Sequence, residues 1–272
     1  MSFAISTPPN TGRRPMPAEV VKSVDRALHI LQHIADSGGT IGLSRLASEA
    51  CLPLPTVHRI VRSLLAHDYV RQVPSRQYAL GPRLVRLGEA ASGTLGSWAL
   101  PHLRALVEVT GETASMAMLN NDDVVYLAEA PSSHSMRTST PIGRRALPHA
   151  TAVGKALLAQ CSDDQVRALL GRTGLPVLTS NTVVTTEALI SELVVIRRSG
   201  YAVDHEEEEL GACCVAVAVP ETPMRVAISV AGPSTRVTAA RVPQLAATLQ
   251  RAASHLGAEV HRGQGVNAYP EP

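Results

Sequence analysis

The feature that most constrains this chain is the segment 23–81, in which apolar residues recur at helical spacing and then give way to strand-like segments. A first helix is predicted from Ser23, and Ser37-Gly38-Gly39 ends it because glycine favours turns over helix interiors. Few folds accommodate several short helices followed directly by a hairpin. The residues expected on the inward side of this first helix are Val24, Ala27, Leu28, Leu31 and Ile34.

Two further helices and a hairpin complete the pattern. A short helix is predicted over 43–50 and a third over 55–67, with Cys51-Leu52-Pro53 as the turn between them. Pro55 suits the first turn of a helix, where its missing N–H has no partner to lose. Two short strands around Pro74-Ser75-Arg76 predict a wing. We therefore expect a winged helix-turn-helix domain over 19–81.

The third helix carries the functional information in this domain. Its apolar stripe comprises Val57, Ile60, Val61, Leu64 and Leu65, and its other side is polar and basic. Arginine forks onto guanine in the major groove, and hydroxyl groups take phosphates, so this face predicts a recognition helix. The candidate DNA-contacting residues are Arg26, Ser44, Thr56, His58, Arg59, Arg62, Arg76 and Tyr78.

Charge is divided unevenly along the chain. Residues 1–100 carry 11 Lys/Arg and 6 Asp/Glu, whereas 101–272 carry 14 and 17. The first part is therefore suited to a polyanion such as double-stranded DNA. Periodicity and charge leave open that the trihelical unit only mediates protein contacts. Segments 1–18 and 259–272 are expected to be disordered tails.

Several observations place the protein in the cytoplasm. The four cysteines show no disulfide or CxxC spacing, which indicates reduced thiols. The longest apolar run, 212–219, is far shorter than the roughly 20 residues of a membrane span, so we expect no membrane association. The start lacks the apolar stretch of a signal peptide.

Beyond the wing, a linker helix is predicted over 82–97, with Leu84, Leu87, Ala91 and Leu95 on one face. This face either packs on its own domain or contacts a second copy. Residues 98–258 then mix strand-like and helix-like segments, which predicts an α+β domain with an antiparallel sheet. Strands are expected at 113–119, 124–129, 136–138, 201–204, 214–219 and 225–230, and helices at 98–110, 153–159, 163–170, 186–199 and 238–256.

Nothing in 98–258 points to an enzyme or to a cofactor. Dinucleotide, phosphate-loop and GxSxG motifs are missing from the sequence, and Gly154-Lys155 is a lone dipeptide. The acidic run 206–209 is interpreted as a solvated loop, and the histidines lack zinc-site spacing, so no metal is expected. One rival hypothesis remains: an enzyme or substrate-binding protein whose helical head only mediates assembly.

A small-molecule site is better supported at the predicted helix that begins near Val153. Thr151 is placed to cap this helix. The N–H groups of Ala152, Val153 and Gly154 would then be free at the positive end of the helix dipole. A carboxylate can bind there without a cationic side chain.

Several separate motifs resemble the IclR family of bacterial regulators over residues 20–258. They are LPLPTVHRIVRSLLAHDYVRQVPSRQYALGPRLVRLG, GETASMAML, LPHATAVGKALLA, RRSGYAVDHEEEELGACCVAVAVP and AISVAGPSTRV. The resemblance implies a GAF-like effector domain and homodimers that can pair into homotetramers. It also implies an effector site whose residues are Ala146, Ala152, Val153, Asp204, Cys214, Ser229 and Ala231.

Two of these positions depart from one pattern of the family. Binders of small acids tend to have glycine at the place of Ala152 and a second serine at that of Ala231, so glyoxylate and pyruvate are disfavoured here. The sequence thus predicts a ligand-responsive repressor of a metabolic or catabolic operon that senses a small carboxylate. The alternative is a DNA-binding protein whose C-terminal domain only oligomerises.

Overall fold

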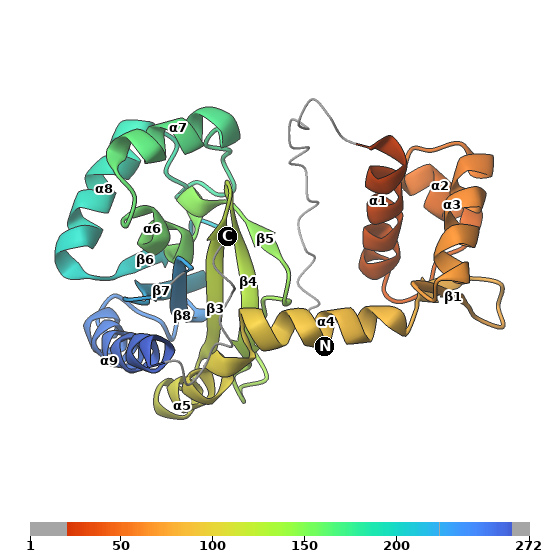
Figure 1. Cartoon of the computed structure of the whole chain (residues 1–272). Helices are drawn as coiled ribbons and strands as arrows, with labels where there is room; N and C mark the ends of the chain where they lie inside the picture. The colour runs from red at the N-terminus through yellow and green to blue at the C-terminus, as the bar shows by residue number, and fades with distance from the viewer. Residues whose placement is uncertain (1–20, 223, 263–272) are drawn as a thin grey trace. The chain divides into compact units, whose positions relative to one another are not determined.

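A small aliphatic core organises the first of the two units into which the chain divides, 1–90 and 91–272. The computed structural model describes residues 21–222 and 224–262 (Figure 1). The predicted winged helix-turn-helix is confirmed in the first unit. Its elements are α1 (Lys22–Asp36), α2 (Leu43–Glu49), α3 (Leu54–Ala66), β1 (Val70–Gln72) and β2 (Tyr78–Leu80).

The inward side of α1 differs from the expected one. Ile30 and Ile34 are fully buried, whereas Val24 and Leu28 are 55% and 60% exposed. The core contact is made near the C-terminal end of α1, because α2 and α3 supply their buried side chains there. Val24 and Leu28 were therefore wrongly placed in the core.

Helix α4 (Arg83–Leu95) lies where a linker helix was expected, and the division between the two units falls inside it. The helix begins directly after the wing: the Arg83 N–H donates to the Asp68 carbonyl, and the Arg83 guanidinium lies 5.7 Å from the centre of the Tyr69 ring. These contacts join the first turn of α4 to the winged domain.

The second unit is a six-stranded antiparallel sheet with helices on both faces (Figure 1). The elements are η1 (Ser97–Ala99), α5 (Leu100–Thr110), β3 (Thr113–Asn120), β4 (Asp123–Ala130), β5 (Arg145–Ala146), η2 (Pro148–Ala150), α6 (Ala152–Leu158), α7 (Asp163–Thr173), α8 (Thr186–Ser199), β6 (Ala202–His205), β7 (Ala212–Ala218), β8 (Val226–Pro233) and α9 (Val242–His261). The strand order is β5-β4-β3-β8-β7-β6, which confirms the predicted α+β fold. Helices α5 and α9 pack on one face, and α6, α7 and α8 pack on the other.

Two predicted elements need correction, and one strand was not predicted. The strand expected at 136–138 is absent from the described sheet: the Thr138 hydroxyl and carbonyl bond to Ala231 and Thr113 in place of a strand ladder. Strand β5 was missed because two residues show no periodicity. Helix α9 starts later than expected, with a proline in its first turn, and it continues to His261. The expected tail over 259–272 therefore began too early. The expected tail over 1–18 lies outside the described residues.

Small side chains line the sheet face that α6 covers. Ser115 on β3 lies opposite Ser229 on β8, which lies opposite Ala216 on β7. Ala117 and Ala227 form the neighbouring pair on the same face. Because side chains of directly paired residues point to the same side of a sheet, this floor is shallow, and the first turn of α6 lies close above it.

Candidate DNA interface and effector site

The two sides of α3 are separated as the sequence predicted. Val57 and Val61 are buried in the core of the first unit. Its other side is open to solvent: His58, Arg59, Arg62 and Ser63 are exposed, and Thr56 is half-buried. This face therefore offers guanidinium, imidazole and hydroxyl groups together, from consecutive turns of one helix.

The four arginines expected to contact DNA are not neutralised by acidic side chains of this unit that the structure describes. Arg26, Arg59, Arg62 and Arg76 are exposed and form no ion pair with any described residue. Ser44, also exposed, lies in the first turn of α2. Unpaired arginines leave their charge available for phosphate or base edges, which is what a DNA-binding surface needs.

The wing places Arg76 at its tip. The Arg76 N–H donates to the Val73 carbonyl and the Val73 N–H to the Gln77 carbonyl, which closes the turn, and Arg76 adopts a left-handed φ of 59°. Tyr78 lies on the inner side of β2, is only 9% exposed and belongs to the core of the unit. Its burial leaves little surface for a DNA contact, so we withdraw Tyr78 from the interface.

In the second unit, the predicted cap of α6 is present. The Thr151 hydroxyl accepts the Gly154 N–H at 3.1 Å. This bond occupies one of the three N–H groups that were expected to be free, so the Gly154 N–H is not available to a ligand. The N–H groups of Ala152 and Val153, both on fully buried residues, find no acceptor in the described part of the chain.

The sheet brings most of the other expected site residues into one row. Asp204 on β6 pairs with Cys214 on β7, which pairs with Ala231 on β8. Ser229 lies two residues before Ala231 on the same side of β8, and its hydroxyl opposes the rise in the pKa of the Cys214 thiol. Ala146 belongs to the same apolar cluster as Ala152 and Val153. All seven expected residues therefore border the layer between the sheet and α6.

Burial raises the pKa of two side chains in this row, Asp204 and Cys214. It raises the pKa of Asp204 to about 7, the charges of Glu207 and Glu208 raise it too, and the Glu207 N–H, which donates to Oδ1 at 2.7 Å, opposes them. Burial likewise raises the pKa of the Cys214 thiol well above its ordinary value. Near neutral pH, a protonated Asp204 carboxyl can donate a hydrogen bond to an anionic ligand, which a carboxylate cannot.

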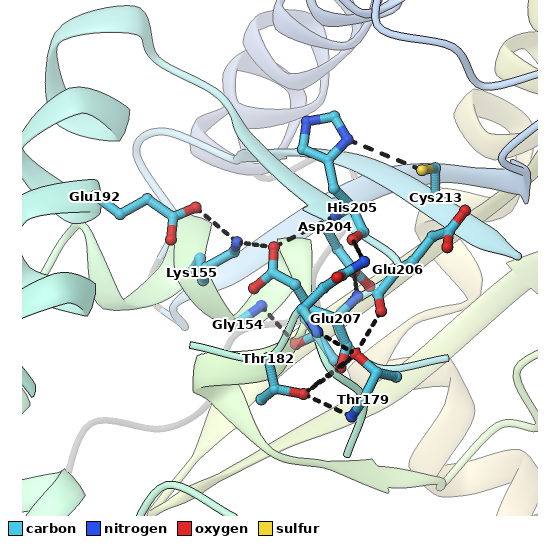
Figure 2. A network of polar contacts seen from close by, with 12 residues as sticks. Gly154, Lys155, Thr179, Thr182, Glu192, Asp204, His205, Glu206, Glu207 and Cys213 are labelled. Carbon is cyan, nitrogen blue, oxygen red and sulfur yellow. Dashed lines mark hydrogen bonds and ion pairs between the residues drawn. The ribbon is translucent and has the colours of Figure 1, made fainter. Parts of the chain in front are cut away.

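Lys155, which sequence reasoning set aside, lies at the centre of a buried network (Figure 2). Its side chain is fully buried, and Nζ lies 2.6 Å from one oxygen each of Glu192 and Glu207. The hydroxyls of Thr179 and Thr182 donate hydrogen bonds to backbone carbonyls of the loop that carries Glu207. The network fixes the loop after β6 against α6, and the Glu207 N–H in turn orients Asp204.

The acidic run 206–209 is thus not simply a solvated loop. Glu207 is 6% exposed, and Glu208 pairs with Arg144 at 2.8 Å in a half-buried position. Only Glu209 of the last three is fully open to solvent. The one available signal was the position of Lys155 within an otherwise apolar helix, where a cation requires buried anions.

Two family models match the chain in order. The IclR helix-turn-helix domain matches residues 23–74, and the C-terminal domain of the bacterial transcriptional regulator IclR matches 91–258. The chain belongs to the IclR family. It is therefore a DNA-binding transcriptional regulator of the IclR type, and the predicted family membership is confirmed.

Relatives support the same assignment along nearly the whole chain. The transcriptional repressor IclR of Escherichia coli strain K12 is 36% identical over 260 residues, 93% of this chain and 92% of that protein. The acetate operon repressor of Salmonella typhimurium strain LT2 is 35% identical with the same coverage. A solved IclR homolog from Microbacterium hydrocarbonoxydans, complexed with 4-hydroxybenzoate, shares the fold with a TM-score of 0.78 at 23% identity, over 89% of this chain and 99% of that one.

Across the part of the chain that is described, no helix combines the length and apolar character needed to cross a membrane.

Proposed function

We propose that this IclR-type regulator is a repressor of a metabolic operon whose second unit senses a small carboxylate. The observation that carries the proposal is the exposed face of α3, where Arg59 and Arg62 have no acidic partner among the described side chains. The relatives from Escherichia coli and Salmonella typhimurium are both repressors, which favours repression here too.

A carboxylate fits the groups gathered beneath α6. Two N–H groups, of Ala152 and Val153, lack acceptors in the described structure, and the Asp204 carboxyl is protonated in part near pH 7. Both donate hydrogen bonds, and neither requires a cation. The Microbacterium homolog binds 4-hydroxybenzoate, a carboxylate, which is consistent with this class of effector.

We further propose that the regulator acts as a dimer. In the first unit, Val21, Val24 and Leu28 on one side of the first helix are more than half exposed, as is Val85 on α4. Apolar side chains clustered in this way favour contact with a second copy. A two-fold dimer presents two copies of α3 to a palindromic operator. Analytical ultracentrifugation of Val24→Glu/Leu28→Glu tests this, and an unchanged mass would remove these residues from the contact.

The effector and the operator are coupled through two states of the protein. An effector shifts their balance only by its different affinity for the two states. Helix α4 is the covalent connection between the two units, so a change that begins in the second unit can reach the first through its backbone. Enzymatic activity plays no part in this scheme.

The experiment is titration of the full-length protein onto a fluorescent fragment of the DNA upstream of its own gene. We expect binding that weakens steeply as salt rises, because phosphate neutralisation releases counterions. Arg59→Ala and Arg62→Ala should each cost about 1–3 kcal/mol on the specific site. Arg251→Ala, on the exposed side of α9, is the matched control and should bind like the wild type.

Unchanged isotherms for both α3 variants would refute the assigned role of this face. Effector sensing is tested separately by thermal shift with small carboxylic acids, because a ligand of the native state raises its melting temperature. DNA binding without any stabilising acid would favour the alternative, in which the second unit only oligomerises.

A further inference from the structure

Two hydroxyl groups near the proposed effector site are unused by the protein. Ser115 on β3 is 3% exposed and Tyr126 on β4 is 6% exposed. Neither hydroxyl has a hydrogen-bond partner within residues 21–222 and 224–262. Neither oxygen is among the fully covered polar atoms that lack a partner in the described residues, so each hydroxyl keeps open surface that a ligand can reach and bond to.

Tyr126 lies on the floor side of the sheet and belongs to the same apolar cluster as Ala152 and Val153. Its neighbour across the sheet is Ala117, followed by Ala227, and neither obstructs a ring that lies over them. Burial raises the pKa of Tyr126 most, and the charges of Glu208 and Cys214 raise it further. The raised pKa keeps the phenol uncharged, so it can donate a hydrogen bond to a ligand.

Ser115 lies on β3, on the same face of the sheet as Tyr126 and the effector residues. It is directly paired with Ser229 on β8. Ser115 and Ser229 therefore present neighbouring hydroxyls on one face, and the first of them is free to bind a ligand.

The charges nearby decide what kind of group these hydroxyls receive. The Arg144 guanidinium is already paired with Glu208, and the Lys155 ammonium is already paired with Glu192 and Glu207. A second carboxylate on the ligand would meet neutral hydroxyls and a surplus of acidic groups, and it would find no unpaired cation among the described side chains here. The acidic side chains close to this floor are Glu129, Asp204, Glu207 and Glu208.

We propose that Tyr126 and Ser115 bind an uncharged hydroxyl of the effector, which makes the effector a hydroxylated monocarboxylic acid and excludes dicarboxylic acids. This inference rests on the proposed function, in which the carboxylate binds at the start of α6. Ala152 and Val153 thus hold one end of the ligand, and the two hydroxyls select the other.

The test uses sets of acids that differ only at the end remote from one carboxylate. They are propionate, 3-hydroxypropionate and malonate; hexanoate, 6-hydroxyhexanoate and adipate; and benzoate, 4-hydroxybenzoate and terephthalate. Thermal shift of the full-length protein identifies the binding set, and calorimetry gives its dissociation constants. We expect the hydroxy acid of that set to bind most tightly and the dicarboxylate most weakly.

The variants assign that preference to residues. Tyr126→Phe and Ser115→Ala should each weaken the hydroxy acid roughly 3- to 10-fold, the value of one hydrogen bond, and leave the unsubstituted acid unchanged. Tyr201→Phe, on the sheet face covered by α5 and α9, is the matched control and should alter neither. Melting temperatures without ligand show whether each variant is folded.

The possible failures are distinct. If unsubstituted and hydroxylated acids bind equally, or if both variants keep the preference, the inference is wrong while the carboxylate site stands. If the dicarboxylate binds most tightly, the inference is also wrong. If no acid in any set binds, the inference and the proposed effector class fall together.

Discussion

Replacing Lys155 by methionine should destabilise the second unit far more than an ordinary surface change. Lysine and methionine have similar unbranched stems, so the substitution removes the charge and preserves most of the packing. The substitution leaves the Glu207 carboxylate, which is 6% exposed, without its cation. Its Oε1 then keeps only a 3.4 Å contact with the His205 N–H, and its Oε2 has no described partner.

The magnitude follows from the burial of the two glutamates. Removing one partner of a buried ion pair typically costs about 3–5 kcal/mol, because the other charge stays buried and unpaired. The Glu192 side chain is 32% exposed, so water can solvate its carboxylate once Lys155 is replaced. Loss of the Lys155–Glu192 ion pair therefore adds only about 0–1 kcal/mol to the destabilisation. The double variant Lys155→Met/Glu207→Met leaves no buried charge at this place and should cost much less than Lys155→Met alone.

Urea unfolding followed by tryptophan fluorescence measures this effect. Trp98 is the only tryptophan of the chain and lies in the second unit, so its emission reports on that unit. With a slope of about 2 kcal/mol per molar urea, the midpoint for Lys155→Met should fall by roughly 2 M. A loss below about 1 kcal/mol, or a double variant no more stable than Lys155→Met, would refute the view that this lysine neutralises a buried carboxylate.

Two further predictions concern the same unit. Because the pKa of Asp204 is raised from 3.8 to about 7, its native state binds the proton more tightly than the unfolded chain does, so stability should fall as pH rises from 4 to 7. Asp204→Asn should remove this part of the slope in melting curves at several pH values, and an identical slope would contradict the assignment. Gly154→Ala should destabilise by about 1–3 kcal/mol, since a Cβ would lie 2.3 Å from the Pro148 carbonyl oxygen. Gly171→Ala in α7, which meets nothing within 4 Å, should instead stabilise by about 0.5–1 kcal/mol, and equal melting temperatures for the two variants would show that the contact is relieved cheaply.

The sequence was enough to predict the order of the elements in the winged domain and the face of α3 that carries arginine. Helical spacing, a proline in the first turn and a hairpin are local patterns, so a linear reading identifies them. The Thr151 cap was equally local, because donor and acceptor are three residues apart. The helical spacing wrongly predicted that Val24 and Leu28 are buried, because the buried side of α1 depends on where α2 and α3 lie.

The groups around the proposed effector site come together only in the tertiary structure. Lys155 and Glu207 are 52 residues apart in the chain, and the charge of Asp204 affects the pKa of Tyr126 only because β4 and β6 belong to one sheet. Strand pairing sets such neighbours, and it is a non-local property that no spacing in the sequence encodes. Burial also raises the pKa of Asp204. Within the acidic run that the sequence suggested was a solvated loop, Glu207 is buried because it pairs with Lys155.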